Sequence, residues 1–164
     1  MSPGAVPPAD PPWLSATSQG WVARLLRSHQ QAFGRPLWAG LEASRDPRQA
    51  AQELFAASAV VLAHDGAADP HFVYANRAAL ILWRRTWPEM VGLPSRLSAA
   101  PGDRPERATA LQRARQGPIR HYAGERIDSQ GRHFRLEGAR LWTVHDDDGT
   151  ACGQAATFGR WWWL

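Results

Sequence analysis

The C-terminal third of the chain constrains the fold most, because its residues alternate in character with a period of two. Three alternating segments cover residues 119–127, 132–144 and 151–158. This period predicts β-strands with one buried face. The connections "SQG" and "HDDDGT" are long enough only for hairpins, and Asp148-Gly149 is a favoured hairpin turn. We therefore expect an antiparallel meander of three strands.

The central region predicts two further strands and the helices that pack on them. The stretches 58–64 and 71–75 are rich in β-branched and aromatic residues, which favour strands. Helical patterns follow at 77–85 and 103–117, with a one-turn helix between them. This order indicates an α+β fold, in which a five-stranded antiparallel sheet carries helices on one face. Such a layering leaves room for a cavity between the helices and the sheet.

Several helix starts are marked by short polar residues. Asn76 follows a strand and is placed to cap the next helix. Three other starts pair Asp or Thr with Gln or Glu three positions later, the spacing of a capping box. These pairs are Asp46 with Gln49, Thr86 with Glu89, and Asp103 with Glu106.

The chain divides into four stretches. Residues 1–14 are rich in proline and predict a disordered tail, and residues 15–46 form an N-terminal helical extension. The folded domain covers residues 47–160, followed by a tryptophan-rich end at 161–164. Because the extension is amphipathic, its apolar side must pack against the domain or against a partner copy.

The sequence gives no sign of an internal disulfide, a membrane span or a secretory signal. A single cysteine, Cys152, rules out an internal disulfide. No stretch approaches the roughly 18 apolar residues of a membrane span. The N-terminus lacks the basic-then-apolar order of a secretory signal. We therefore expect a cytoplasmic protein that does not enter membranes.

Charged and metal-binding residues give no signal for nucleic acid or metal. All 19 basic residues are arginine, and they are scattered among acidic residues rather than clustered. We therefore do not expect nucleic-acid binding. The six histidines show neither the i,i+4 spacing of a helical metal site nor a His-x-His pair on a strand. No metal site is predicted.

Several motifs carry a resemblance to a known family. The segment "YANRAALILWRRTWPEMVGLP" resembles the signature of PAS domains, with an Asn after a short strand, a helix and a Thr-x-x-Glu turn that ends at Gly. Four strings in the same order are similar to the MEKHLA domain, a PAS relative: "YANRAAL", "GLPSRLSA", "RHFRLEGARLW" and "DGTACGQAA". The resemblance covers roughly residues 20–160 and implies a PAS-like fold with a sensing role.

The flavin-binding LOV subgroup of PAS domains is similar in one loop. Gly92, Ser95 and Arg96 match its glycine, its reactive cysteine position and its phosphate-binding arginine. A serine cannot form the photochemical thioether, so that chemistry is absent here. Arg126 and Leu136 stand where the resemblance implies two asparagines against the flavin ring. The cofactor is therefore unknown, with flavin possible but disfavoured.

The candidate ligand-binding residues are Gln154, Arg96, Ser95, Asn76 and Arg126. Gln154 shares strand parity with Phe158, so a buried Phe158 would bring the amide into the core. Its partners would be a ligand, as the resemblance implies, or the backbone or Arg126. Arg96 would otherwise pair with a carboxylate, Ser95 would be a loop hydroxyl, and Asn76 a structural cap.

The sequence supports two functions of different kinds. The first is a sensory or small-ligand-binding module that signals through protein–protein contact, by way of a homodimer or another protein at the N-terminal helix. The second is a ligand-free dimerisation or interaction domain. We find no nucleophile–base motif and no phosphate or dinucleotide loop, so catalysis is not expected.

Overall fold

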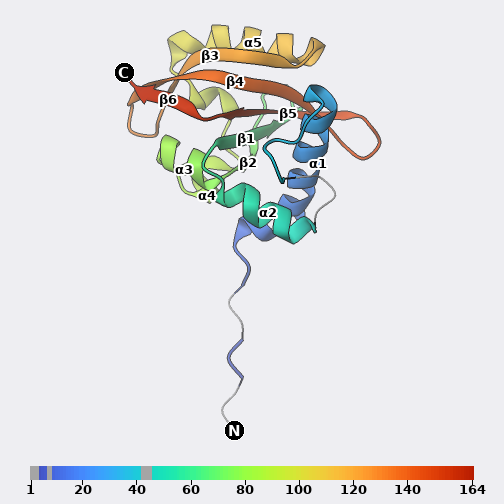
Figure 1. Cartoon of the computed structure of the whole chain (residues 1–164). Coiled ribbons are helices and arrows are strands. Elements are labelled where there is room, and N and C mark those ends of the chain that lie inside the picture. The colour runs from blue at the N-terminus through green and yellow to red at the C-terminus, as the bar shows by residue number, and fades with distance from the viewer. Residues whose placement is uncertain (1–3, 7–8, 42–45) are drawn as a thin grey trace.

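The fold is seen in a computed structural model that describes residues 4–6, 9–41 and 46–164 (Figure 1). Its central sheet has the strand order β2-β1-β5-β4-β3, with every neighbouring pair antiparallel. The strands are β1 (Val60–Asp65), β2 (Phe72–Ala75), β3 (Ile119–Ile127), β4 (His133–His145) and β5 (Ala151–Phe158). The predicted five-stranded α+β sheet is therefore confirmed, including its C-terminal meander.

The tryptophan-rich end adds a sixth strand, β6 (Arg160–Trp163). It pairs with β4, with Trp163 opposite Phe134 and their ring centroids 5.8 Å apart. Strand β4 has 13 residues and β5 only 8, so β5 leaves the first half of one β4 edge open for β6. Residues 160–163 thus continue the sheet instead of forming a loose end.

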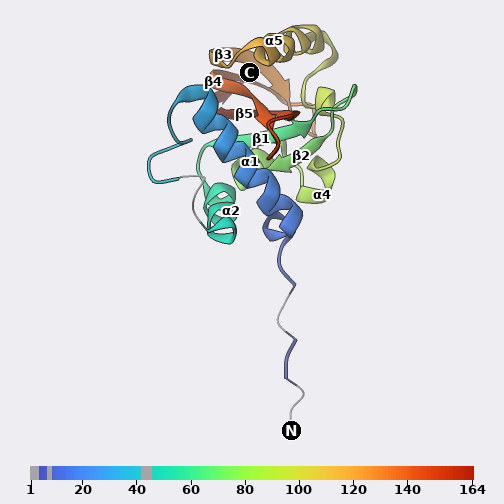
Figure 2. The same cartoon turned by 90° about the vertical axis from the view of Figure 1, so that its right-hand side faces the viewer.

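Helices cover both faces of the sheet. Figure 2 shows α1 crossing the sheet, and Figure 1 shows α5 over β3. The α-helices are α1 (Ala16–Phe33), α2 (Pro47–Ala56), α3 (Arg77–Trp83), α4 (Trp87–Met90) and α5 (Arg104–Gln116). Short 3-10 turns are η1 (Pro12–Leu14), η2 (Ser95–Ser98) and η3 (Pro101–Asp103). Helix α2 packs beside α1 on the same side of the sheet. The prediction that all helices of the domain lie on one face is therefore wrong for α2. Among the described residues, no helix combines the length and the apolarity needed to cross a membrane.

The apolar side of α1 is buried within the chain. Val22, Leu25 and Leu26 belong to the same core cluster as Trp142 and Val144 of β4. Of the two alternatives left by the sequence, the structure therefore selects packing against the domain for this side of the helix. The N-terminal helix covers one face of the sheet, and its apolar side chains form part of the core on that face.

Part of the stretch expected to be a tail is also packed. Residues 12–14 form η1, in which Leu14 is buried, and the Trp13 ring stacks on Phe55 at 3.9 Å. Residues 1–3 and 7–8 of that stretch lie outside the described residues, as do residues 42–45 next to the expected domain boundary. The folded unit thus begins before residue 15, because an aromatic residue in a proline-rich segment has a core to pack against.

The predicted helix caps have different outcomes. Asp46 accepts from the Gln49 N–H, and Glu89 accepts from the Thr86 N–H at 3.0 Å, which confirms those two helix starts. The capping box predicted at Asp103 and Glu106 is wrong. Asp103 makes no side-chain cap, since the 3-10 turn η3 runs into α5, and Glu106 instead accepts from the Tyr122 hydroxyl.

Candidate functional site

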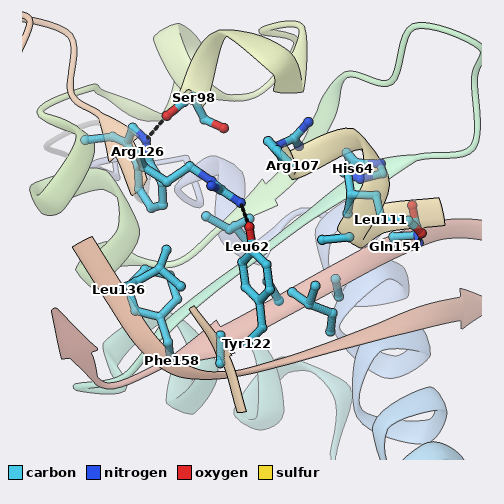
Figure 3. Close-up of a pocket in the computed structure, with 16 residues that line it drawn as sticks. Leu62, His64, Ser98, Arg107, Leu111, Tyr122, Arg126, Leu136, Gln154 and Phe158 are labelled. Atoms are coloured by element: carbon cyan, nitrogen blue, oxygen red, sulfur yellow. Dashed lines mark hydrogen bonds between the residues drawn. The ribbon is translucent and has the colours of Figure 1, made fainter. Parts of the chain in front are cut away.

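A small internal cavity lies between the sheet and the helices α3 and α5, with a volume of about 40 Å³. Figure 3 shows Arg107 and His64 on one side of this space and Leu136 and Phe158 on the other. The walls come from β1, α3, η2, α5, β3, β4 and β5, so the cavity forms only when the whole domain folds. The lining residues are Leu62, His64, Trp83, Ser98, Arg107, Ala110, Leu111, Tyr122, Arg126, Leu136, Ala139, Leu141, Gln154, Ala155, Ala156 and Phe158.

Two arginines in the cavity wall are buried without a carboxylate partner. Arg107 of α5 and Arg126 of β3 are each only 8% exposed. Arg126 donates to the Glu125 carbonyl at 2.7 Å and to the Tyr122 hydroxyl at 3.0 Å. Arg107 makes no hydrogen bond or ion pair within the described part of the chain. Burial and the neighbouring charge of Arg126 lower the pKa of Arg107 to about 10.

Two acceptor atoms at the cavity also lack partners among the described residues. His64 Nδ1 lies 2.8 Å from the Asp65 carbonyl oxygen, so Nδ1 carries the proton and the buried Nε2 is a bare acceptor. Gln154 donates through Nε2 to the Leu111 carbonyl at 2.7 Å, and its buried Oε1 is unpartnered. Burial lowers the pKa of His64 to about 4, so the ring is neutral at pH 7.

A glycine on β3 allows the arginine and the phenol to lie together. Tyr122, Gly124 and Arg126 share one strand face. A Cβ atom at Gly124 would lie 2.6 Å from the Tyr122 hydroxyl and 3.1 Å from Arg126 Nη1. The Tyr122 hydroxyl donates to Glu106 Oε2 at 2.8 Å while it accepts from Arg126. Glycine thus lets the guanidinium lie along the sheet toward the cavity.

Of the sequence-predicted residues, Gln154 and Arg126 lie in this cavity wall. Gln154 is 4% exposed, on the same sheet side as the buried Phe158, as the strand parity predicted. Its amide bonds to the backbone of α5 and not to Arg126. The structure therefore brings these two together, while their ligand-binding role stays a prediction.

Asn76 lies elsewhere and is fully used in the fold. Its Oδ1 accepts from the N–H groups of Ala79 and Val61, at 3.2 and 3.0 Å. Its Nδ2 donates to the carbonyls of Leu54 and Ala59. The side chain caps α3 and ties it to β1 and α2, and no donor is left for a ligand.

Ser95 and Arg96 are not among the residues that line the cavity. Arg96 is half exposed and pairs with Asp69, with Nε 3.2 Å from the carboxylate. Ser95 is buried, and its N–H donates to the Pro70 carbonyl at 2.8 Å. Both residues hold η2 against the loop before β2, so the loop that resembles the flavin loop does not contribute them to this cavity.

Three important cavity residues were not singled out from the sequence: His64, Arg107 and Tyr122. A signal exists for two of them. Arg107 stands three residues before Ala110 and seven before Ala114, and all three are buried on α5. His64 alternates with Val60 and Leu62 on β1. Both patterns place a polar side chain on a face otherwise made of core residues.

Comparison with solved structures defines the class. A PAS domain from Colwellia psychrerythraea matches with a TM-score of 0.59 and 14% identity, over 67% of this chain and 92% of that one. An RNA-binding light-oxygen-voltage receptor matches with a TM-score of 0.61 and 21% identity, over 75% of this chain but only 35% of the receptor. A light-oxygen-voltage domain described with a flavin analogue matches with a TM-score of 0.55 and 15% identity, over 74% and 86%. The chain therefore has a PAS-like fold.

The family of the chain is identified by a match to a sequence model. The family model of the MEKHLA domain matches residues 19–163, and the chain belongs to this family. The match begins within α1 and ends at the last residue of β6, so it includes most of the N-terminal helix and all of the C-terminal strand. A search among curated proteins finds no significant match.

A flavin does not fit the residues of this cavity as they stand. The volume of about 40 Å³ is well below the roughly 300–1,000 Å³ of pockets that enclose drug-sized ligands. The apolar side chain of Leu136 lies in the wall where a flavin carbonyl would need a donor.

The fold also gathers three metal-ligating side chains that sequence spacing could not reveal. One ligand atom from each of Asp103, Glu125 and His133 lies within 4.8 Å of the others. They come from η3 and from the neighbouring strands β3 and β4 of one hairpin. His133 is exposed and the other two are half-buried, and such acidic groups are common on protein surfaces without an ion.

Proposed function

We propose that this chain is a sensory module that binds a small ligand in the internal cavity and signals through protein–protein contact, without catalysis. The single observation that carries the proposal is the unpartnered polar set in the cavity wall. A buried acceptor without a partner costs roughly 1–3 kcal/mol. A ligand that donates hydrogen bonds to Gln154 Oε1 and His64 Nε2 would remove this free-energy cost.

The sheet offers a route from the cavity to α1. Leu141 of β4 lines the cavity, and the next residue, Trp142, packs on the α1 side of the same strand. The Trp142 ring meets the His29 ring of α1 edge-on at 4.9 Å. A ligand that shifts β4 would therefore change the seating of α1, and so the population of states that a partner recognises.

The partner would meet the outer side of α1, whether it is a second copy or another protein. Arg24 is half-exposed there, with its guanidinium 5.3 Å from the Trp21 ring centroid. We include a cytoplasmic location in the proposal. No carboxylate or thiol lines the cavity, which supports binding without chemistry.

A ligand-free interaction domain is the second candidate. It is favoured by the small volume of the cavity and by the exposed apolar surface of β6, where Trp161 and Trp162 are 37% and 40% exposed. Under this alternative, the cavity is a packing defect that binds nothing, and Gln154 only anchors β5 to α5.

The two candidates are separated by native mass spectrometry of the purified protein and by thermal shifts across a library of small metabolites. The first predicts a bound species or a stabilising compound, and loss of that effect in Gln154→Leu. Gln112→Leu, on the exposed side of α5, is the matched control and should respond like the parent. An empty protein that no compound stabilises, and that Gln154→Leu makes more stable, would leave the interaction domain.

The α1 interface is tested by solution mass from light scattering. Arg24→Glu reverses a charge on the outer side of α1 and should shift the complex toward monomer. Arg113→Glu, on the exposed side of α5, should not. Removal of residues 1–35 is unsuitable here, because it would strip the cover from Trp142. Equal masses for the parent and both variants would exclude α1 as a self-association surface.

A further inference from the structure

We propose that the cavity ligand is a small carboxylate with a hydroxyl or amino group on the neighbouring carbon. This inference rests on the proposed ligand-binding function and names its chemical class. It comes from the combination of buried cations, bare acceptors and limited space.

The charge around the cavity calls for an anion. Arg107 and Arg126 bring two guanidinium groups to a wall that contains no carboxylate. The nearby Glu106 is linked to Arg126 only through the Tyr122 hydroxyl. Buried cations are normally paired, because removing a charge from water is costly. A ligand carboxylate fits, since guanidinium forks bind such groups through paired hydrogen bonds.

The acceptors require a second group on the ligand. Gln154 Oε1 and His64 Nε2 both need a donor, and a bare carboxylate or inorganic anion would face them with more lone pairs. A hydroxyl or ammonium group beside the carboxylate supplies that donor. The Gln154 amide is held by its bond to Leu111, so its oxygen keeps a fixed direction. The arginines and these acceptors then bind opposite ends of one molecule.

The volume limits the ligand to a few heavy atoms. A cavity of about 40 Å³ has room for a few water molecules, since roughly 10–15 Å³ by this measure holds one. Short acids of two or three carbons are the size to consider, with movement of the long arginine side chains to admit them. Leu62, Leu136 and Phe158 leave an apolar wall for a hydrogen or methyl substituent. Nucleotides, peptides and aromatic cofactors are too large.

The test compares three probes of nearly equal size by isothermal titration calorimetry with the full chain. Glycolate has both required groups, acetate lacks the donor, and glycolamide is the neutral isostere. We expect glycolate to bind at least roughly tenfold more tightly than either, the worth of one charge-assisted hydrogen bond. Glycine and lactate then decide between amino and hydroxyl donors and show the space for a methyl group.

Variants connect the binding to these residues. Arg107→Met keeps length and removes charge, so it should abolish the glycolate response and raise the melting temperature of the ligand-free protein, because an unpaired buried charge is gone. Arg113→Gln, exposed on the same helix, should leave both quantities unchanged. An Arg107→Met protein with a lower melting temperature and undiminished glycolate binding would overturn the assignment.

The outcomes also distinguish this inference from the proposed function. Binding of glycolamide or another neutral compound, without glycolate binding, would refute the carboxylate and keep the ligand-binding module. Equal binding of acetate and glycolate would refute the requirement for a donor. Failure of every charged and neutral probe, together with an empty native mass, would remove both proposals.

Discussion

The two faces of the sheet each bury a histidine, and the two histidines differ in their partners. On the α1 face, His29 Nε2 lies 2.9 Å from Arg140 Nη1, and its Nδ1 lies 3.1 Å from the Arg35 carbonyl oxygen. Arg140 also donates to the Leu37 carbonyl at 3.2 Å. On the cavity face, His64 and Arg107 are also buried, but among the described residues His64 Nε2 has no hydrogen-bond partner and Arg107 has no carboxylate partner.

This difference shows how to separate a structural polar group from a candidate binding group. The buried histidine of the α1 face is explained by its own neighbours, since each ring nitrogen has a protein partner. Only one ring nitrogen of the cavity histidine, Nδ1 of His64, has a protein partner. Burial of a polar residue is therefore no functional signal by itself, whereas burial with an unused atom directed into a cavity is one.

The largest test of the comparison concerns the packing of the α1 face. Trp142 is fully buried against His29 and Phe33, and the substitution Trp142→Ala should destabilise the fold by about 3–5 kcal/mol. Urea unfolding followed by circular dichroism measures this loss. Leu136→Ala, beside the existing cavity, should enlarge the cavity and cost less than Trp142→Ala. An equal or greater cost for Leu136→Ala would show that the cavity face is packed as tightly as the α1 face.

Acid should weaken both faces together. Burial lowers the pKa of His29 and of His64 from 6.5 to about 4, so the folded protein holds both rings neutral while the unfolded chain protonates them. Their stabilisation is complete above pH 6.5 and is lost as the pH falls through 4, on the order of 3 kcal/mol for each. Urea midpoints between pH 7.5 and 4 measure it. The proposed ligand donates to His64 Nε2 and so favours the neutral ring, which lowers that pKa further; glycolate binding should therefore weaken as the pH falls through 4.

Replacing the two histidines separates the faces. His29→Leu leaves an Arg140 donor and the Arg35 carbonyl without partners and should cost about 1–3 kcal/mol. His64→Leu removes one bond to Asp65 together with a bare acceptor, so its cost in the ligand-free protein should be smaller. Chemical denaturation of the two variants side by side is the measurement. A larger loss for His64→Leu would mean that the cavity histidine is the structural one.

The smallest expected effect on stability comes from Gly124. The substitution Gly124→Ala places a methyl group against the flexible ends of Tyr122 and Arg126, so we expect roughly 1 kcal/mol of destabilisation. Binding of glycolate should fall much more, because the guanidinium must turn away. Gly159→Ala, which has no atom within 4 Å of the new Cβ, is the matched control. An unchanged affinity for glycolate in Gly124→Ala would show that Arg126 does not bind the ligand.

Local patterns predicted much of the fold. Period-two alternation and short turns specify antiparallel neighbours, and the polar residues before α2, α3 and α4 specify helix starts, because both effects act over a few residues. The parity of β5 also placed Gln154 correctly beside Phe158. The wrong capping box at Asp103 shows the limit of such patterns. Glu106 has the right spacing but finds the hydroxyl of Tyr122, 16 residues away in sequence.

The elements, their order and the burial of Gln154 thus follow from the residues themselves, since alternation and capping depend on near neighbours in the chain. The cavity could not be derived in the same way. Arg107, Arg126 and His64 come from α5, β3 and β1, and only the packed sheet brings their side chains to one space. Whether a buried polar atom has a partner depends on groups distant in sequence. For this reason, tertiary structure alone separated the satisfied histidine of the α1 face from the unsatisfied one at the cavity.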